Sequence, residues 1–91
     1  MKKLNDLLGP SKYLIVLDLF LQNPEELMNL REIARRINKN PASVMKVLPI
    51  IVKRNYLTRT RIGAKVVAYK LNKENIIVRL LLEFLEKLQE D

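Results

Sequence analysis

The sequence contains no cysteine, histidine or tryptophan, and these absences exclude several kinds of chemistry. Without cysteine there is no disulfide framework and no redox-sensing thiol, and without histidine as well the usual zinc ligands are missing. There is also no glycine-rich phosphate loop, and the basic middle of the chain holds no carboxylate cluster. An enzyme would therefore lack its usual acid, base and nucleophile. We expect a protein that is not an enzyme and that uses neither a cofactor nor a metal.

Long apolar runs are also missing from the sequence. No run approaches the roughly 18 residues of a membrane span, and the first residues lack the apolar segment of a signal peptide. We therefore expect a cytoplasmic protein without a membrane partner. Its length of 91 residues fits one domain, residues 1–91. Because so short a chain buries only a modest share of its surface, association with a second copy is expected to help its stability.

Negative charge is scarce in the middle of the chain. Residues 31–70 hold eleven lysines and arginines but a single acidic residue, Glu32, which gives this segment a net charge of +10. The rest of the chain, with six basic and nine acidic residues, has a charge of −3. This separation indicates that the middle of the chain binds a polyanion. A ribosomal or membrane-surface role would use such a block too, so charge alone does not single out DNA.

Apolar spacing predicts two helices in the first third of the chain. A short helical turn over residues 4–8 ends at Gly9-Pro10. The next helix, about 11–22, is apolar around nearly its whole circumference, so it must be buried on more than one side. Asn23-Pro24 ends it, because proline disfavours helical geometry in the residue before it.

The next two helices have the spacing of a helix-turn-helix, over about residues 30–55. Asn29 followed by Glu32 resembles a capping box, which begins a helix over about 30–37. A three-residue turn follows, and Asn40-Pro41 combines a cap with a first-turn proline to open the next helix, which ends near Asn55. Two helices joined by so short a turn are typical of this motif.

Beyond residue 55 the pattern changes to that of strands. Residues 56–61 and 66–71 are rich in β-branched and aromatic residues and flank Gly63, which predicts a basic hairpin, or wing, over about 56–71. Asn72 then caps a last helix over about 72–89. The expected fold class is mainly α with a small β-hairpin wing (α+β).

The segments LREIARRI, SVMKVLPIIVKRNYL and TRTRIGAKVVAYKLN, residues 30–37 and 43–72, resemble the winged helix-turn-helix regulators that include the ArsR and MarR families. The resemblance implies a dimeric transcription regulator that binds double-stranded DNA sequence-specifically, with N- and C-terminal dimerisation helices. Asn55-Tyr56 stands where this group has Gly-Leu, although asparagine also tolerates positive φ. Pro49 is the stronger departure, since proline inside a helix removes a backbone bond and either bends the helix or breaks it in two.

This resemblance implies three groups of DNA contacts. Recognition helices reach base edges with residues near their N-terminus, and the base contacts expected here are Ala42, Ser43, Met45 and Lys46. Lysine can donate to guanine, and alanine or methionine can touch a thymine methyl group. The expected phosphate contacts are Arg35, Arg36, Lys39 and Lys53, and the expected wing contacts are Arg59, Arg61 and Lys65.

Each assignment has a simpler alternative. Lys46 could touch phosphate only, Ser43 could merely support the start of its helix, and the arginines could form a solvated charged face. Tyr56 and Tyr69 could stack on unpaired bases, but their alternation with polar residues favours core packing.

The last helix has more apolar residues than one buried stripe requires, which predicts a homodimer interface. The expected interface residues are Ile77, Leu81, Phe84, Leu85 and Leu88. The alternative is a monomer whose first and last helices bury each other. Two other functions stay open: a protein-interaction module that uses exposed Ile50 and Val52, and a non-specific binder of RNA or DNA.

Overall fold

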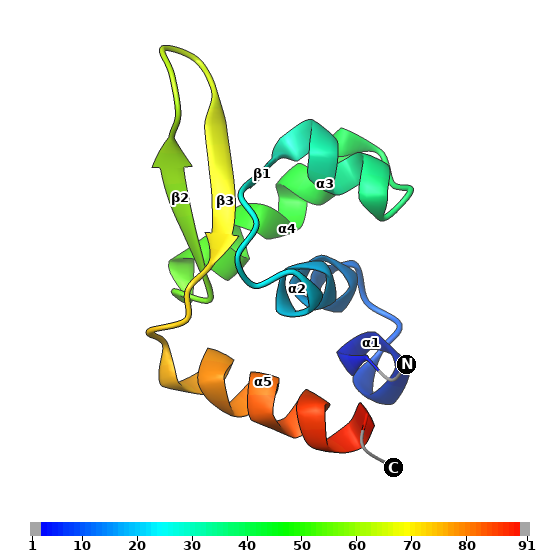
Figure 1. Ribbon diagram of the computed structural model, residues 1–91. Coiled ribbons are helices and arrows are strands. Elements are labelled where there is room, and N and C mark those ends of the chain that lie inside the picture. Colours follow the sequence, from blue (N-terminus) through cyan, green and yellow to red (C-terminus); the bar gives the residue numbers. More distant parts are fainter. Residues whose placement is uncertain (1–2, 90–91) are drawn as a thin grey trace.

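A computed structural model describes residues 3–89, which form five helices and a three-stranded antiparallel sheet (Figure 1). In chain order the elements are α1 (Leu4–Leu8), α2 (Lys12–Gln22), β1 (Met28–Asn29), α3 (Leu30–Arg36), α4 (Pro41–Lys53), β2 (Leu57–Arg61), β3 (Val67–Leu71) and α5 (Ile76–Gln89). This confirms the expected α+β class and the order of its helices and hairpin.

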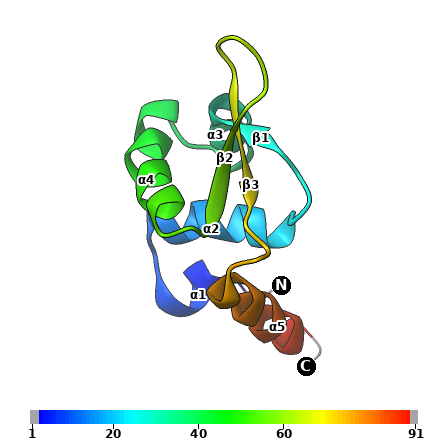
Figure 2. The same ribbon diagram turned by 90° about the vertical axis from the view of Figure 1, so that its left-hand side faces the viewer.

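The core is built around α2, which packs against α1, α4, α5 and β3. Because α2 is apolar around most of its circumference, it buries Val16 and Leu17 as well as Phe20 and Leu21, as its pattern predicted. Helices α3 and α4 and the sheet lie on one side of α2, whereas α1 and α5 lie on the other, as both views show (Figures 1 and 2). The hairpin therefore projects from the end of the molecule opposite to α5.

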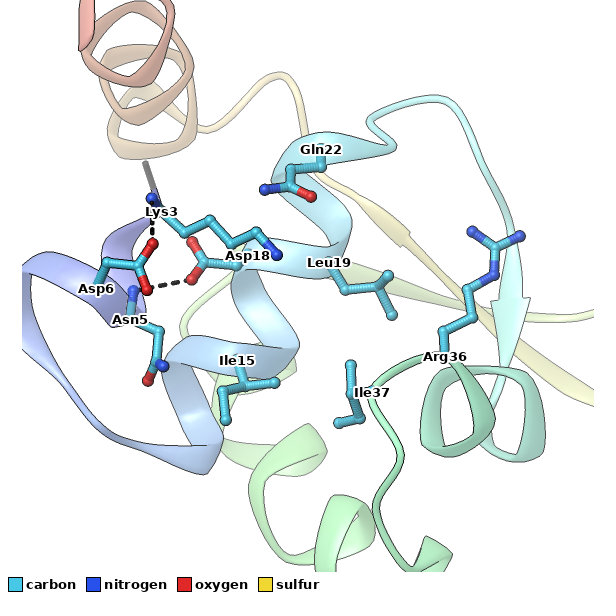
Figure 3. Close-up of a pocket in the computed structure, with 9 residues that line it drawn as sticks. All are labelled: Lys3, Asn5, Asp6, Ile15, Asp18, Leu19, Gln22, Arg36 and Ile37. Carbon is cyan, nitrogen blue, oxygen red and sulfur yellow. Dashed lines mark hydrogen bonds between the residues drawn. The ribbon is translucent and has the colours of Figure 1, made fainter. Parts of the chain in front are cut away.

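A buried carboxylate attaches α1 to α2. Asp18 is only 3% exposed, and its two oxygens accept hydrogen bonds from the backbone N–H groups of Leu4 (2.9 Å) and Asn5 (2.8 Å). These N–H groups stand at the start of α1, where a helix has no internal acceptor for them. Figure 3 shows Asp18 pointing from α2 toward Asn5. Asp18 therefore caps a helix that is 13 residues away in sequence, a role that no sequence pattern indicated.

The caps of the helix-turn-helix are those that the sequence predicted. The side chain of Asn29 accepts from the N–H of Glu32 (2.9 Å), and that of Asn40 accepts from the N–H of Ala42 (2.7 Å), with Pro41 in the first turn of α4. Asn38 takes a positive φ of 55° in the turn between them. The Glu32 side chain, however, pairs with two arginines, so the reciprocal half of the capping box is absent from α3.

Helix α4 continues through Pro49 to Lys53. The alternative in which Pro49 breaks the recognition helix in two is therefore wrong. The buried residues Val44, Leu48 and Ile51 hold both halves of the helix against the core, which offsets the missing backbone bond. Asn55 then takes a φ of 65°, the left-handed conformation that asparagine was expected to tolerate at this helix end.

The wing is a hairpin of β2 and β3 in which Leu57 pairs with Leu71 and Arg61 with Val67. A third strand, β1, pairs with β3 through Met28 opposite Tyr69 and ties the wing to the start of α3. The sequence analysis missed β1, because two residues are too few to display the alternation of a strand. Apart from Leu57, the residues of β2 are exposed to solvent, whereas β3 buries Ala68, Tyr69 and Leu71.

The expected start of the last helix was wrong. Helix α5 begins at Ile76, and its cap is Asn75, whose side-chain oxygen accepts from the N–H groups of Ile77 (2.8 Å) and Val78 (3.2 Å). Asn72 instead donates its side-chain amide to the carbonyl oxygen of Asn55 (2.8 Å). The backbone N–H of Asn72 also donates to the carbonyl oxygen of Tyr56 (2.9 Å), which holds Asn72 beside the start of the hairpin and ahead of the helix.

Candidate nucleic-acid interface

Two adjoining hollows border the wing: one of about 420 Å³ lies between α4 and the hairpin, and one of about 530 Å³ lies between the hairpin and the segment where β1 ends and α3 begins. Met45, Arg59 and Tyr69 line both of them, and together they form what we call the α4–wing hollow. The cations around it are Arg31 at the start of α3, Lys53 at the end of α4, and Arg59 and Lys65 of the hairpin. Among residues 3–89 no acidic side chain lines it, so its electrostatic potential suits an anion.

The exposed face of α4 borders this hollow. Ala42, Met45 and Lys46 are exposed, as expected for residues that meet a ligand. Ser43 differs, because it is half-buried and its hydroxyl accepts a hydrogen bond from Lys12 Nζ (3.4 Å). Its side chain therefore also serves to join α4 to the start of α2.

The two arginines at the end of α3 already have partners. Arg35 binds Glu32, and Arg36 binds both Glu32 and Glu26, each through contacts of 2.7 Å. Hydrogen bonds from Arg35 and then Arg36 lower the pKa of the Glu32 carboxyl, and bonds to Glu32 and then Glu26 raise the pKa of Arg36. A phosphate would have to compete with these carboxylates for either arginine.

The other cations of the basic segment differ in whether they form ion pairs. Lys39, Lys46, Lys53, Arg61 and Lys65 are exposed and, among the residues that the structure describes, make no ion pair. Lys70 lies 3.8 Å from Glu25, and that carboxylate also binds Lys73. Hydrogen bonding from Lys73 is the main cause of the lowered pKa of Glu25. The free cations are thus concentrated on the wing, on α4 and in the turn before α4.

Comparison with solved structures identifies the architecture. The chain is similar to a protein described as a possible transcriptional regulator from Methanosarcina mazei, with a TM-score of 0.69 at 15% identity over 88% of this chain and 70% of that one. It is also similar to wild-type ZitR from Lactococcus lactis in complex with DNA, with a TM-score of 0.61 at 18% identity over 99% of this chain and 67% of that one. The fold is that of the winged helix-turn-helix regulators.

The same fold appears in the ferric uptake regulator of Francisella tularensis, with a TM-score of 0.66 at 18% identity over 71% of this chain. The chain spans only 53% of the length of that regulator. No protein-family model and no curated protein sequence matches the chain. Because all these identities are low, the likeness extends to the fold alone.

The tyrosines of the winged helix belong to its core, which confirms the expectation of packing. Tyr69 is 5% exposed, and Tyr56 packs partly buried against the same cluster. Tyr13 of α2 lies under the Arg54 guanidinium, which is 5.9 Å from the centre of its ring. Burial raises the pKa of the Tyr13 hydroxyl. The burial of Tyr69 and the partial burial of Tyr13 and Tyr56 favour packing over stacking on unpaired bases.

Helix α5 presents apolar side chains on two sides. Its inner side packs Val78, Leu81, Leu82 and Leu85 on the core. Its outer side leaves Ile76, Ile77, Leu80 and Phe84 between 43% and 61% exposed. Of the expected interface residues, Ile77 and Phe84 thus lie outward, Leu81 and Leu85 pack inward, and Leu88 is half-buried. Leu7 and Leu8 of α1 are exposed at the same end of the molecule (Figure 1).

A separate hollow of about 510 Å³ lies between α1, α2 and the end of α3 (Figure 3). Ile15, Leu19 and Ile37 form its apolar part, and its charged residues are Lys3, Asp6, Asp18 and Arg36. Because charges of both signs line it, this hollow is less suited to a polyanion than the α4–wing hollow.

The structure also adds and corrects particular residues. Arg31 was not among the expected contacts, although it was one of the eleven cations that marked the basic segment. Val52 is half-buried against the core rather than exposed, so only Ile50 of that expected pair offers an open apolar surface. No helix within residues 3–89 has the length and apolar character needed to cross a membrane.

Proposed function

We propose that this chain is a double-stranded DNA-binding transcription regulator of the ArsR/MarR-like type, a single winged-helix domain that acts in the cytoplasm as a homodimer. The observation that carries the proposal is the α4–wing hollow. Four cations and no carboxylate surround it, and it lies between an exposed helix and a projecting hairpin.

The shape of B-DNA explains why this arrangement suits a duplex. Its major groove is about 12 Å wide and admits an α-helix, and the adjacent minor groove lies across one sugar-phosphate strand. If α4 enters the major groove and the wing meets the minor groove, that strand passes over the hollow between them. Arg31, Lys53, Arg59 and Lys65 are then in position to neutralise its phosphates.

The remaining expected contact residues fall into two groups: those that are exposed, and those that already bind another side chain. Ala42, Met45 and Lys46 face the bases, Lys39 contacts phosphate beside them, and Arg61 extends the wing contact. Ser43 contributes only if it releases Lys12, and Arg35 and Arg36 only if phosphate displaces their carboxylates.

The proposal is tested by titrating labelled duplex, matched single strand and RNA with the protein at several salt concentrations. Each neutralised phosphate should lower log affinity by about 0.9 per unit of log salt. The four cations of the hollow alone then give a slope of about −3.6 per protomer. We expect the duplex to bind most tightly with at least this slope. A flat salt response would refute DNA binding, and a preference for RNA would favour the non-specific alternative.

The proposed dimer forms through the outer side of α5. Ile76, Ile77, Leu80 and Phe84 make an apolar stripe that the chain's own core does not cover, and such stripes usually mark association sites. In a two-fold dimer the stripe pairs with its own copy, so that two wings and two recognition helices can face one DNA. The target should then be palindromic, with half-site centres about 34–36 Å apart or a multiple of this distance.

Sedimentation equilibrium at micromolar concentration tests the dimer. Phe84→Glu should produce monomers and weaken duplex binding, because it places a charge on the stripe and spares the inward-facing residues. Glu83→Lys, an exposed position beside it, is the matched control and should stay dimeric. A wild-type mass of one chain would reject the dimer, and undiminished DNA binding by a monomeric variant would reject its role in DNA recognition.

A further inference from the structure

The exposed surface of α4 is largely apolar, whereas a helix that recognises bases mainly by hydrogen bonds presents several polar side chains. Ala42, Met45 and Pro49 follow one another at helical spacing and are all exposed, Met45 at 46%. They form what we call the α4 stripe. Lys46 is the one exposed polar residue between Ala42 and Pro49, because Ser43 is half-buried and holds Lys12. The helix therefore has little capacity to donate to base edges or to accept from them.

The stripe also stands where a duplex would lie. Met45 and Pro49 line the α4–wing hollow, with Arg59 and Lys53 beside them. The apolar side chains are thus next to cations, which suit phosphate, and not next to acidic residues. This charge pattern favours DNA over a protein as the partner of the stripe.

One apolar group is available on the major-groove edge of DNA, the 5-methyl group of thymine. Contact between this methyl group and the stripe removes apolar surface of both partners from water, which is favourable. Over a G·C pair the same side chains would cover donors and acceptors without bonding them, which is unfavourable. An apolar stripe in the major groove therefore discriminates between bases without hydrogen bonds.

We propose that the α4 stripe recognises thymine methyl groups, so that the target DNA carries thymines where Ala42, Met45 and Pro49 meet it. This inference rests on the proposed function, in which α4 occupies the major groove. Met45 is the principal specificity residue, because its side chain is the longest of the three and it alone among them lines both hollows beside the wing.

The test compares two duplexes that differ only in the methyl group: alternating dA-dT, and alternating dA-dU in which uracil replaces every thymine. Because burying one methyl-sized group changes affinity about fourfold, we expect at least a fourfold preference for the thymine duplex. Met45→Ala should reduce this preference toward unity, mainly by weakening binding to the thymine duplex.

Leu27→Ala provides the matched control, since Leu27 is an exposed apolar residue in the loop between α2 and β1. It should leave the preference unchanged. Equal affinity for the two duplexes, with normal salt dependence, would overturn thymine recognition and leave the proposed DNA binding intact. A thymine preference that survives Met45→Ala would also overturn thymine recognition by the stripe, because the preference would then arise from duplex shape. Absence of binding to either duplex at low salt would overturn the proposed function itself.

Discussion

The attachment of α1 by Asp18 leads to a quantitative prediction for Asp18→Ala. The substitution removes both acceptors of the Leu4 and Asn5 N–H groups. A hydrogen bond to a charged group contributes about 1.5–3 kcal/mol, so the two bonds together set an upper limit of about 6 kcal/mol. The variant can reduce this loss if α1 detaches from α2, because water then binds the two N–H groups. Detachment also exposes Leu4, which is only 2% exposed in the folded protein.

Exposing one leucine costs about 1.5–3 kcal/mol. We therefore expect Asp18→Ala to lower the free energy of unfolding by about 3 kcal/mol, a large share of the roughly 5–15 kcal/mol of a typical domain. Urea unfolding followed by circular dichroism measures this loss, and hydrogen exchange of the Leu4 and Asn5 amides tests its cause. Both amides should exchange faster under native conditions in the variant.

Asp6→Ala is the matched control, because Asp6 also accepts a backbone bond at the start of α1, from Lys3 N, but at an exposed position. We expect it to cost less than about 1 kcal/mol, the usual value of a helix cap. If Asp18→Ala were no more destabilising than Asp6→Ala, or if exchange at Leu4 and Asn5 did not change, the assignment of Asp18 as the attachment of α1 would be refuted.

Four further predictions concern helix ends, ion pairs and pH. Glu32→Gln frees Arg35 and leaves Arg36 paired with Glu26 alone, so the salt slope of duplex binding should steepen by about 0.9, the value of one phosphate contact, and an unchanged slope would place Arg35 away from DNA. Asn75→Ala should cost about 1 kcal/mol in urea unfolding if it caps α5 as described. Pro49→Ala should raise the melting temperature, since it restores a backbone bond worth up to about 3 kcal/mol in a helix; a lower value would contradict this. Lys73 lowers the pKa of the Glu25 carboxyl below its ordinary value of 4.5, so the Glu25–Lys73 pair should stabilise the fold above pH 4.5. This stabilisation should be lost as the pH falls through the lowered pKa. Urea titrations at several pH values should show that loss in the wild type and not in Glu25→Gln.

The chain itself determined those features that depend on neighbouring residues. Asn29 and Asn40 cap helices whose N–H groups are two or three residues away, so the caps were visible in the sequence. The positive φ at Asn55 follows in the same way from a helix end that needs it. The apolar spacing of α2 and α4 likewise encodes the faces that become buried.

Tertiary structure decided whatever depends on a distant partner. Asn72 and Asn75 are equally suited to cap a helix, and the bond that distinguishes them, from the backbone N–H of Asn72 to the Tyr56 carbonyl, comes from a residue far away in sequence. Strand β1 exists because β3 offers it a free edge, and its own two residues carry no strand pattern.

The candidate site shows the same division. Composition located the positive charge in residues 31–70, because charge is a property of the residues themselves. Which cations stay available depended on folding, which brings Glu26 to Arg36 and Glu25 to Lys70 but places Arg31, Lys53, Arg59 and Lys65 around a hollow without a carboxylate. Ion pairing acts over a few ångströms in space, and only the packed chain defines those distances.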